Sequence, residues 1–88
     1  MNYLKVITDK DLSQSEKILM IYFLYNYKDT GVHVSYKVIG EELNMTRPTL
    51  IKAVNKLEAK GIIKKENNSD IFGGVGANTY KISTRKYI

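Results

Sequence analysis

Two short stretches of helical sequence lie on either side of a tight turn in the middle of the chain. The first covers Tyr36 to Leu43, and the turn is Leu43-Asn44-Met45-Thr46. Asn44 tolerates the positive φ that such a turn requires. After the turn, apolar residues recur at the i, i+3, i+4, i+7 spacing of one buried helix face, namely Leu50, Ala53, Val54 and Leu57. The segment therefore predicts two helices packed against each other, with other elements covering their apolar faces.

The second of these helices has clear start and stop signals. Thr46 is a good N-cap, and Pro48 falls in the first turn, where its missing N–H costs little. Gly61 suits the left-handed position that ends a helix. We therefore expect a helix over Arg47 to Lys60.

The residues that this helix leaves facing outward have side chains suited to DNA. They are Arg47, Pro48, Thr49, Ile51, Lys52, Asn55 and Lys56. Arg47 and Lys52 have the chemistry to pair with phosphates or with guanine, and Asn55 carries the amide that binds adenine through two hydrogen bonds. An α-helix fits the major groove of B-DNA, and its free N-terminal N–H groups favour a nearby phosphate. The alternative is an ordinary solvated helix face.

The excess positive charge lies entirely in the second half of the chain. The 88 residues include 14 Lys and Arg against 9 Asp and Glu, a formal net charge of +5. Residues 1–46 carry five basic and six acidic side chains, whereas residues 47–88 carry nine basic and three acidic ones. This asymmetry indicates a polyanion-binding face, with a basic surface kept for solubility as the alternative.

Composition excludes several classes of protein. Cysteine is absent and His33 is the only histidine, so disulfides, zinc fingers and iron–sulfur sites are ruled out, and we expect no metal and no cofactor. We also expect no enzyme, because the sequence has neither a Gly-rich phosphate loop nor paired carboxylates beside a histidine. The longest apolar run, Ile18 to Tyr25, is too short for a bilayer, which needs about 20 residues. With no targeting segment visible, the expected location is cytoplasmic, with no membrane contact.

A first helix is expected near the N-terminus. Ser13 and Glu16 have the spacing of a capping box, so the helix should run through Lys17 to about Lys28 and end near Gly31. Its apolar run is hydrophobic all the way round, which requires cover on every side. We expect a homodimer through this helix, with a central core helix of a monomer as the alternative. The expected interface residues are Leu19, Tyr22 and Phe23.

Three strands are expected in the remaining sequence. Val32 to Val34 predicts a brief strand, and Ile62 to Glu66 with Asn78 to Ser83 predict a hairpin. The hairpin loop, residues 67–77, is rich in Gly and Asn. It carries Ile71 and Phe72, which we expect to fold back onto the core rather than to contact a DNA groove.

The two ends of the chain have weaker patterns. Residues 3–7 predict a short strand or an ordered arm within residues 1–12, and residues 84–88 predict a tail. The whole chain is therefore expected to be one domain, residues 1–88, of the α+β class and mainly α, with three helices and a β-hairpin.

Three motifs within residues 13–83 match a known pattern. They are Ile39-Gly40-Glu41-Glu42-Leu43-Asn44-Met45-Thr46-Arg47-Pro48-Thr49-Leu50, Leu57-Glu58-Ala59-Lys60-Gly61-Ile62-Ile63, and Asn78-Thr79-Tyr80-Lys81-Ile82. Through these motifs the chain resembles the winged helix-turn-helix family of bacterial DNA-binding domains, of the plasmid, phage or MarR-like type. Gly40 stands where the family usually has Ala, and Asn44 where it usually has Gly.

The resemblance implies a double-stranded DNA-binding protein. Arg47, Thr49, Lys52 and Asn55 would contact bases or phosphates in the major groove, and the hairpin would form a wing near the adjacent minor groove. The residues that would hold flanking phosphates are Lys56, Lys64, Lys65 and Lys81.

The implied biological role is a small transcriptional repressor. The alternative is a plasmid partition or conjugative relaxosome adaptor, with replication, partition or transfer proteins as partners. A third alternative, of another class, is a protein–protein interaction module that uses the fold without DNA.

Overall fold

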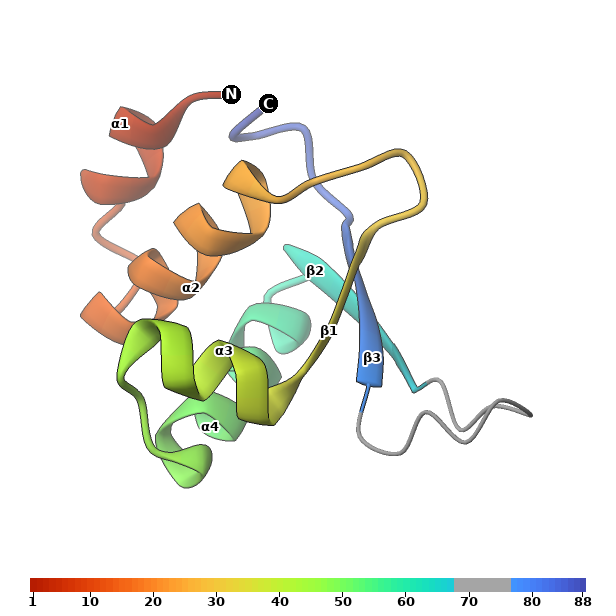
Figure 1. The fold of residues 1–88 in the computed structure, drawn as a ribbon. Helices are drawn as coiled ribbons and strands as arrows, with labels where there is room; N and C mark the ends of the chain where they lie inside the picture. The colour runs from red at the N-terminus through yellow and green to blue at the C-terminus, as the bar shows by residue number, and fades with distance from the viewer. Residues whose placement is uncertain (68–76) are drawn as a thin grey trace.

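The computed structural model describes residues 1–67 and 77–88. Along the chain the elements are α1 (Tyr3–Ile7), α2 (Gln14–Tyr25), β1 (Val32–Ser35), α3 (Tyr36–Leu43), α4 (Arg47–Ala59), β2 (Ile63–Asn67) and β3 (Ala77–Ile82). This order confirms the α+β class and the predicted helix pair (Figure 1). Ile71 and Phe72, whose packing was predicted above, lie outside the described residues.

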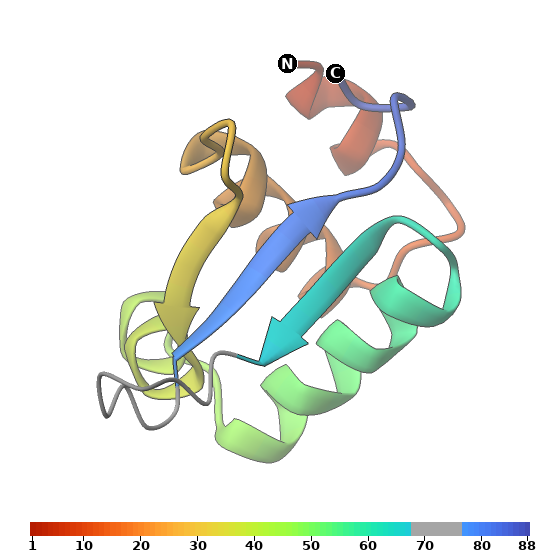
Figure 2. The ribbon, with the colours of Figure 1, turned by 90° about the vertical axis from the view of Figure 1, so that its right-hand side faces the viewer.

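The three strands form one antiparallel sheet in the order β1-β3-β2. Val32 and Lys65 are both paired with Tyr80, which places β3 in the centre. The helices lie on one face of the sheet, as the edge-on and face-on views together show (Figures 1 and 2). The sheet therefore has an inner face toward the helices and an outer face toward solvent.

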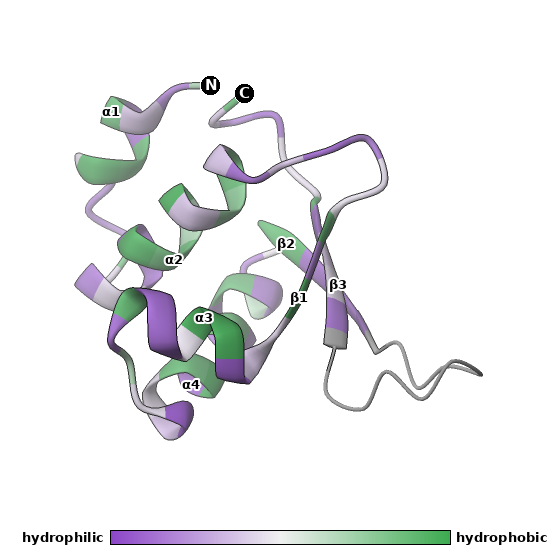
Figure 3. Cartoon of the chain, in the orientation of Figure 1, coloured by the Kyte–Doolittle hydropathy of each residue, from purple (hydrophilic) through white to green (hydrophobic). Residues whose placement is uncertain are grey.

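The hydrophobic core lies between α2, α4 and the inner face of the sheet. The buried face of α2 is formed by Leu19, Met20, Phe23 and Leu24, and that of α4 by Leu50, Ala53, Val54 and Leu57. The Phe23 ring stacks on the Tyr80 ring with 4.7 Å between centroids, which joins α2 to β3. Hydrophobic residues are spread along both α1 and α2 (Figure 3), and some of them are exposed, namely Leu4, Ile7 and Ile18.

The helix start at Ser13 is confirmed, and the predicted end is wrong. The Ser13 hydroxyl accepts from the Glu16 N–H, and the Glu16 carboxylate accepts from the Ser13 N–H. The helix ends at Tyr25 rather than near Lys28, because the Asn26 side-chain amide donates to the Tyr22 carbonyl at 2.9 Å and closes the last turn. Gly31 has a positive φ of 98°, but it precedes β1 instead of ending the helix.

The prediction of a strand or arm over residues 3–7 is also wrong, because this segment is the helix α1. The Asn2 side chain accepts from the Lys5 N–H at 3.0 Å and caps the start, and the Thr8 hydroxyl donates to the Leu4 carbonyl at 2.8 Å near the end. Val6 is fully buried against the rest of the domain. The fold therefore has a helix where the sequence pattern was weak.

The predicted tail is part of the domain, and it holds the N-terminal segment. The Asn2 N–H donates to the Tyr87 carbonyl at 2.7 Å, and the Lys86 ammonium lies 2.9 Å from the Asp9 carboxylate. Tyr87 is fully buried, and its hydroxyl donates to Asp9. We call these four residues the terminal clasp. Asn2 and Asp9 lie at one end of the sequence and Lys86 and Tyr87 at the other, so no local pattern indicates that they meet.

Two further observations concern membranes and metals. Among the helices of residues 1–67 and 77–88, none is long and apolar enough to cross a bilayer. The same residues contain no cluster of three or more metal-ligating side chains.

Candidate nucleic-acid interface

The tight turn between α3 and α4 sets the direction of α4 relative to α3. Asn44 adopts the left-handed conformation with φ 55°, as predicted, and the Met45 N–H donates to the Gly40 carbonyl at 3.0 Å. A Cβ added at Gly40 would lie 2.9 Å from the Met45 carbonyl oxygen, closer than real Cβ atoms come to backbone. Gly40 therefore permits the close approach that this tight turn needs.

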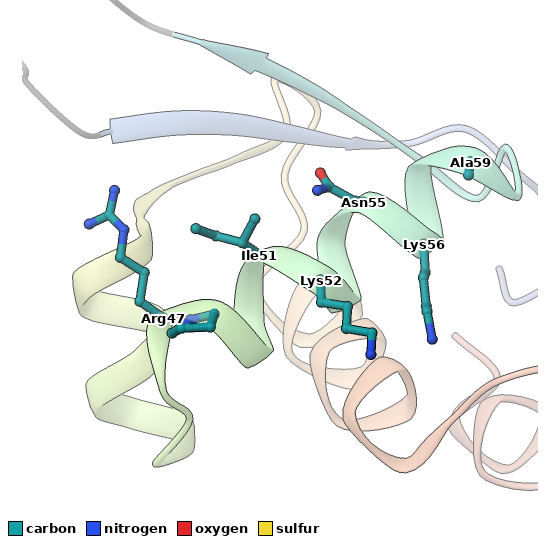
Figure 4. A pocket seen from close by; sticks show the side chains of 7 residues that line it. Arg47, Ile51, Lys52, Asn55, Lys56 and Ala59 are labelled. Carbon is teal, nitrogen blue, oxygen red and sulfur yellow. The ribbon is translucent and has the colours of Figure 1, made fainter.

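The outward side of α4 carries two rows of side chains with i, i+4 spacing. Arg47, Ile51, Asn55 and Ala59 form the first row, and Pro48, Lys52 and Lys56 form the second (Figure 4). A shallow groove lies along these seven residues, and none of them is acidic. In Figure 4 the two lysines of the second row point away from the first row. We call this surface the α4 face.

The α4 face is accessible to a partner. Arg47, Lys52, Asn55 and Lys56 are all exposed, whereas Ile51 is half-buried between them. The face thus combines cations, one amide and a narrow apolar strip, which is the chemistry that binds phosphates, base edges and thymine methyl groups.

The N-terminus of α4 has no side-chain cap from its N-cap residue. Thr46 occupies the predicted N-cap position, but its side chain forms no capping hydrogen bond to the backbone. The Thr46 hydroxyl instead donates to the Thr49 hydroxyl at 2.9 Å, and both residues are exposed. The Thr46 side chain therefore leaves the first-turn N–H groups of Arg47 and Thr49 uncapped, at the end of the helix that favours an anion.

The C-terminal end of α4 is held by contacts within the domain. Gly61 has φ 74° and its N–H donates to the Glu58 carbonyl, while the Ile62 N–H donates to the Leu57 carbonyl, so the predicted end of the helix is confirmed. The Lys60 ammonium lies 2.6 Å from the buried Glu16 carboxylate and donates to the Asp11 carbonyl at 2.6 Å. Lys60 is thus turned toward α2, away from the α4 face.

The three predicted wing lysines lie on two different faces of the sheet. Lys64 is paired with Lys81 across β2 and β3, and both are exposed on the outer face. Lys81 also lies 3.3 Å from the Glu66 carboxylate, which partly neutralises it. Lys65 lies on the inner face, opposite Tyr80 and beside α3. Of these three lysines, Lys65 is the one whose side chain shares the inner face of the sheet with the helices.

Tyr36, the first residue of α3, contacts both Arg47 and Lys65. The Arg47 guanidinium carbon is 5.6 Å from the Tyr36 ring centroid, and the Lys65 ammonium donates to the Tyr36 hydroxyl at 3.2 Å. Tyr36 was not predicted as a site residue, because it is far from both Arg47 and Lys65 along the chain. The one local signal is an aromatic residue directly after a capping serine, Ser35, whose hydroxyl accepts from the Val38 N–H.

The Asn-x-Tyr motif of the return strand holds the wing to the core. Asn78 and Tyr80 lie on the same face of β3, and the Asn78 amide donates to the Tyr80 hydroxyl at 3.0 Å. Burial raises the pKa of Tyr80 above its usual value, so the hydroxyl stays protonated. This hydrogen bond satisfies two buried polar groups beneath the wing.

Two of the three predicted dimer residues are part of the core. Leu19 and Phe23 have no exposed surface, because they pack between α4 and the sheet, so neither can form a dimer contact. Tyr22 is partly exposed, and burial together with the Glu42 carboxylate raises its pKa to about 12. It lines an apolar groove between α1, α2 and α3 with other uncharged residues, namely Tyr3, Ile18, Ile21, Tyr25, Asn26 and Leu43.

The helix pair, the exposed basic helix and the adjoining β-hairpin together define a winged helix-turn-helix protein. A family model described as a helix-turn-helix domain matches residues 10–63, from the turn before α2 to the start of β2. This match covers more than half of the chain, and the chain belongs to that family. No match was found among curated proteins.

Proposed function

We propose that this protein binds double-stranded DNA in a sequence-specific manner, with α4 in the major groove. The observation that carries the proposal is the α4 face, an exposed helix surface with three cations, one amide and no carboxylate. Lys52 and Asn55 are the residues proposed to contact base edges, and Arg47 is proposed to bind a phosphate of the adjoining backbone. Pro48, Thr49 and Lys56 are proposed to lie against the backbone.

The wing supports this arrangement through β2. Lys65 lies beside Tyr36 and Arg47, so a helix in the groove would bring its ammonium toward the flanking phosphates. Lys64 and Lys81 face the other side of the sheet, and we assign them a smaller share of the binding.

We also propose that the second partner is another copy of this chain, at the apolar groove between α1 and α2. Two of the side chains that line the groove are large and exposed, with Ile18 47% exposed and Tyr25 79% exposed. In a two-fold interface both copies present the same surface. One patch must therefore contain both a groove and the side chains that enter the partner's groove. The residues lining the groove carry no charge, so two chains of net charge +5 approach there with the least repulsion.

Selection from a random duplex library tests the DNA-binding proposal. The full chain is expected to select one motif at both about 50 and about 200 mM salt, since base contacts persist when phosphate contacts are screened. The double variant Lys52→Gln/Lys56→Gln should lose the motif. The matched control Lys10→Gln/Lys28→Gln removes the same charge from exposed lysines elsewhere and should keep it. No motif at either salt concentration, or equal loss in the two variants, would overturn the proposal.

The positions of the selected sites in a genome separate the biological roles. Sites that overlap promoters support a transcriptional repressor, whereas sites in a centromere-like region or a transfer origin support a partition or relaxosome adaptor. If DNA binding fails and only changes in the apolar groove affect a partner, the chain acts instead as a protein–protein module.

A further inference from the structure

Tyr36 lies where α3, α4 and β2 meet. It is the first residue of α3, Arg47 is the first residue of α4, and Lys65 lies in the middle of β2. The Tyr36 ring is half-buried, and its centroid is 6.4 Å from that of Tyr80 in the core. One aromatic side chain therefore contacts a cation of α4, the proposed recognition helix, and a cation of β2, the first strand of the proposed wing.

The two cations use different parts of the ring. The Arg47 guanidinium carbon is 5.6 Å from the centroid, within the range of a cation–π contact. The Lys65 ammonium is 5.7 Å from the centroid but only 3.2 Å from the hydroxyl oxygen, which itself projects from the ring edge. Lys65 thus lies beyond the hydroxyl end of Tyr36, and the contact is a hydrogen bond rather than a contact with the ring face.

These contacts orient the cations without neutralising them. Within the described part of the chain, neither Arg47 nor Lys65 forms an ion pair with a carboxylate. An aromatic face and a phenol hydroxyl are uncharged, so both cations keep their full charge for a phosphate. A carboxylate in the place of Tyr36 would hold them as firmly and cancel the attraction to DNA.

We propose that Tyr36 is a positioning residue that holds Arg47 and Lys65 in place for neighbouring phosphates of one DNA backbone, and so couples the recognition helix to the wing. The inference rests on the proposed DNA binding and adds a residue that would not itself need to touch DNA. Its ring orients Arg47, and its hydroxyl orients Lys65.

The test separates the ring from the hydroxyl by double-mutant cycles on the full chain. Tyr36→Phe keeps the ring, so it should weaken duplex binding and make a further Lys65→Gln change nearly without effect. The same Tyr36→Phe change should remain additive with Arg47→Gln. Tyr36→Leu removes both contacts and should be non-additive with each. Tyr36→Phe is expected to weaken binding roughly two- to fivefold, the effect of one lost hydrogen bond. Tyr36→Leu should weaken it more, because it also loses an exposed cation–π contact. Binding is read by fluorescence anisotropy with the selected duplex.

A purely structural role for Tyr36 gives a different pattern. The thermal midpoint of each variant is measured, and Tyr27→Phe, which removes another half-buried tyrosine hydroxyl, serves as the matched control. Additive effects in the Tyr36→Phe/Lys65→Gln cycle and in both Tyr36→Leu cycles, with Arg47→Gln and Lys65→Gln each weakening binding, would overturn this inference alone. If neither Arg47→Gln nor Lys65→Gln changes binding, both this inference and the proposed use of these two cations in DNA binding are overturned.

Discussion

The ammonium group of Lys60 lies 2.6 Å from the carboxylate of Glu16, and this contact joins the end of α4 to the start of α2. The Glu16 side chain is only 3% exposed. One carboxylate oxygen accepts from the Ser13 N–H and the other from Lys60, so both oxygens of a buried charge are satisfied. The same residue caps one helix and holds another in place.

Removal of the Glu16 carboxylate is therefore expected to be costly. Glu16→Ala removes the carboxylate half of the capping box and leaves the partly exposed Lys60 ammonium without its carboxylate partner, and should lower the free energy of unfolding by about 2 kcal/mol. Urea unfolding followed by circular dichroism measures the change. The control Glu41→Ala removes an exposed helical carboxylate and should change stability by less than about 0.5 kcal/mol. Equal losses in the two variants would contradict the proposed importance of the ion pair.

The terminal clasp gives stability a dependence on pH. Hydrogen bonds from Lys86 and Tyr87 lower the pKa of Asp9 well below its ordinary value of 3.8. The folded state therefore favours the ionised carboxylate, so this stabilisation is fully present above about pH 4 and is lost as the pH falls further toward the folded-state pKa. Burial and Asp9 raise the pKa of Tyr87 to about 12, so its hydroxyl remains a donor throughout this range.

Comparison with Asp9→Asn checks this pH dependence. The variant should be less stable than the natural chain at pH 7, and the difference in unfolding free energy should shrink as the pH falls below about 4. Asp29→Asn serves as a control at an exposed position. A difference that stays constant from pH 7 to pH 3 would show that the charge of Asp9 does not contribute to stability.

Adjacent lysines of the wing should have unequal effects on DNA binding. Lys65→Gln should weaken binding to every duplex and reduce the slope of log K against log salt by about one, the effect of one lost phosphate contact. Lys64→Gln removes the same charge from the outer face and should change the slope less. Affinity measured over a salt series tests this, and equal slopes for the two variants would place the DNA on the outer face as well.

The apolar groove between α1, α2 and α3 should determine whether the chain is a monomer or a dimer. Ile18 is 47% exposed and lines the groove, so Ile18→Lys places a charge in the proposed interface without disturbing the core. Sedimentation should show the natural chain as a dimer and this variant as a monomer. Val38→Lys changes an apolar residue of similar exposure on α3 and is the control. A natural chain that sediments as a monomer at high concentration would exclude the dimer.

The elements that depend on local signals could be predicted from the sequence. The capping box at Ser13, the left-handed Asn44 and the Gly61 helix end each use residues within a few positions of one another, and all three are confirmed. The buried face of α4 was also predicted, because its period is visible within one helix. The outward side of that helix followed directly from the same period.

Features that depend on distant residues could not be predicted. The burial of Leu19 and Phe23 depends on the sheet and α4, which cover a helix that seemed to need a second subunit. The separation of Lys64 from Lys65 requires knowledge of which face of the sheet meets the helices. The position of Tyr36 between two cations depends on three elements meeting, and a sequence pattern within one element does not contain that information.

The terminal clasp places the two ends of the chain side by side, on the opposite side of the domain from α4 (Figure 1). A short linker could therefore join residue 88 to residue 1, and the chain could be opened at another exposed loop as a circular permutant. For the same reason, the domain could be inserted into a surface loop of a larger protein. Its entry and exit would be adjacent, so the host would keep its own fold, and α4 would lie on the side of the inserted domain away from the host.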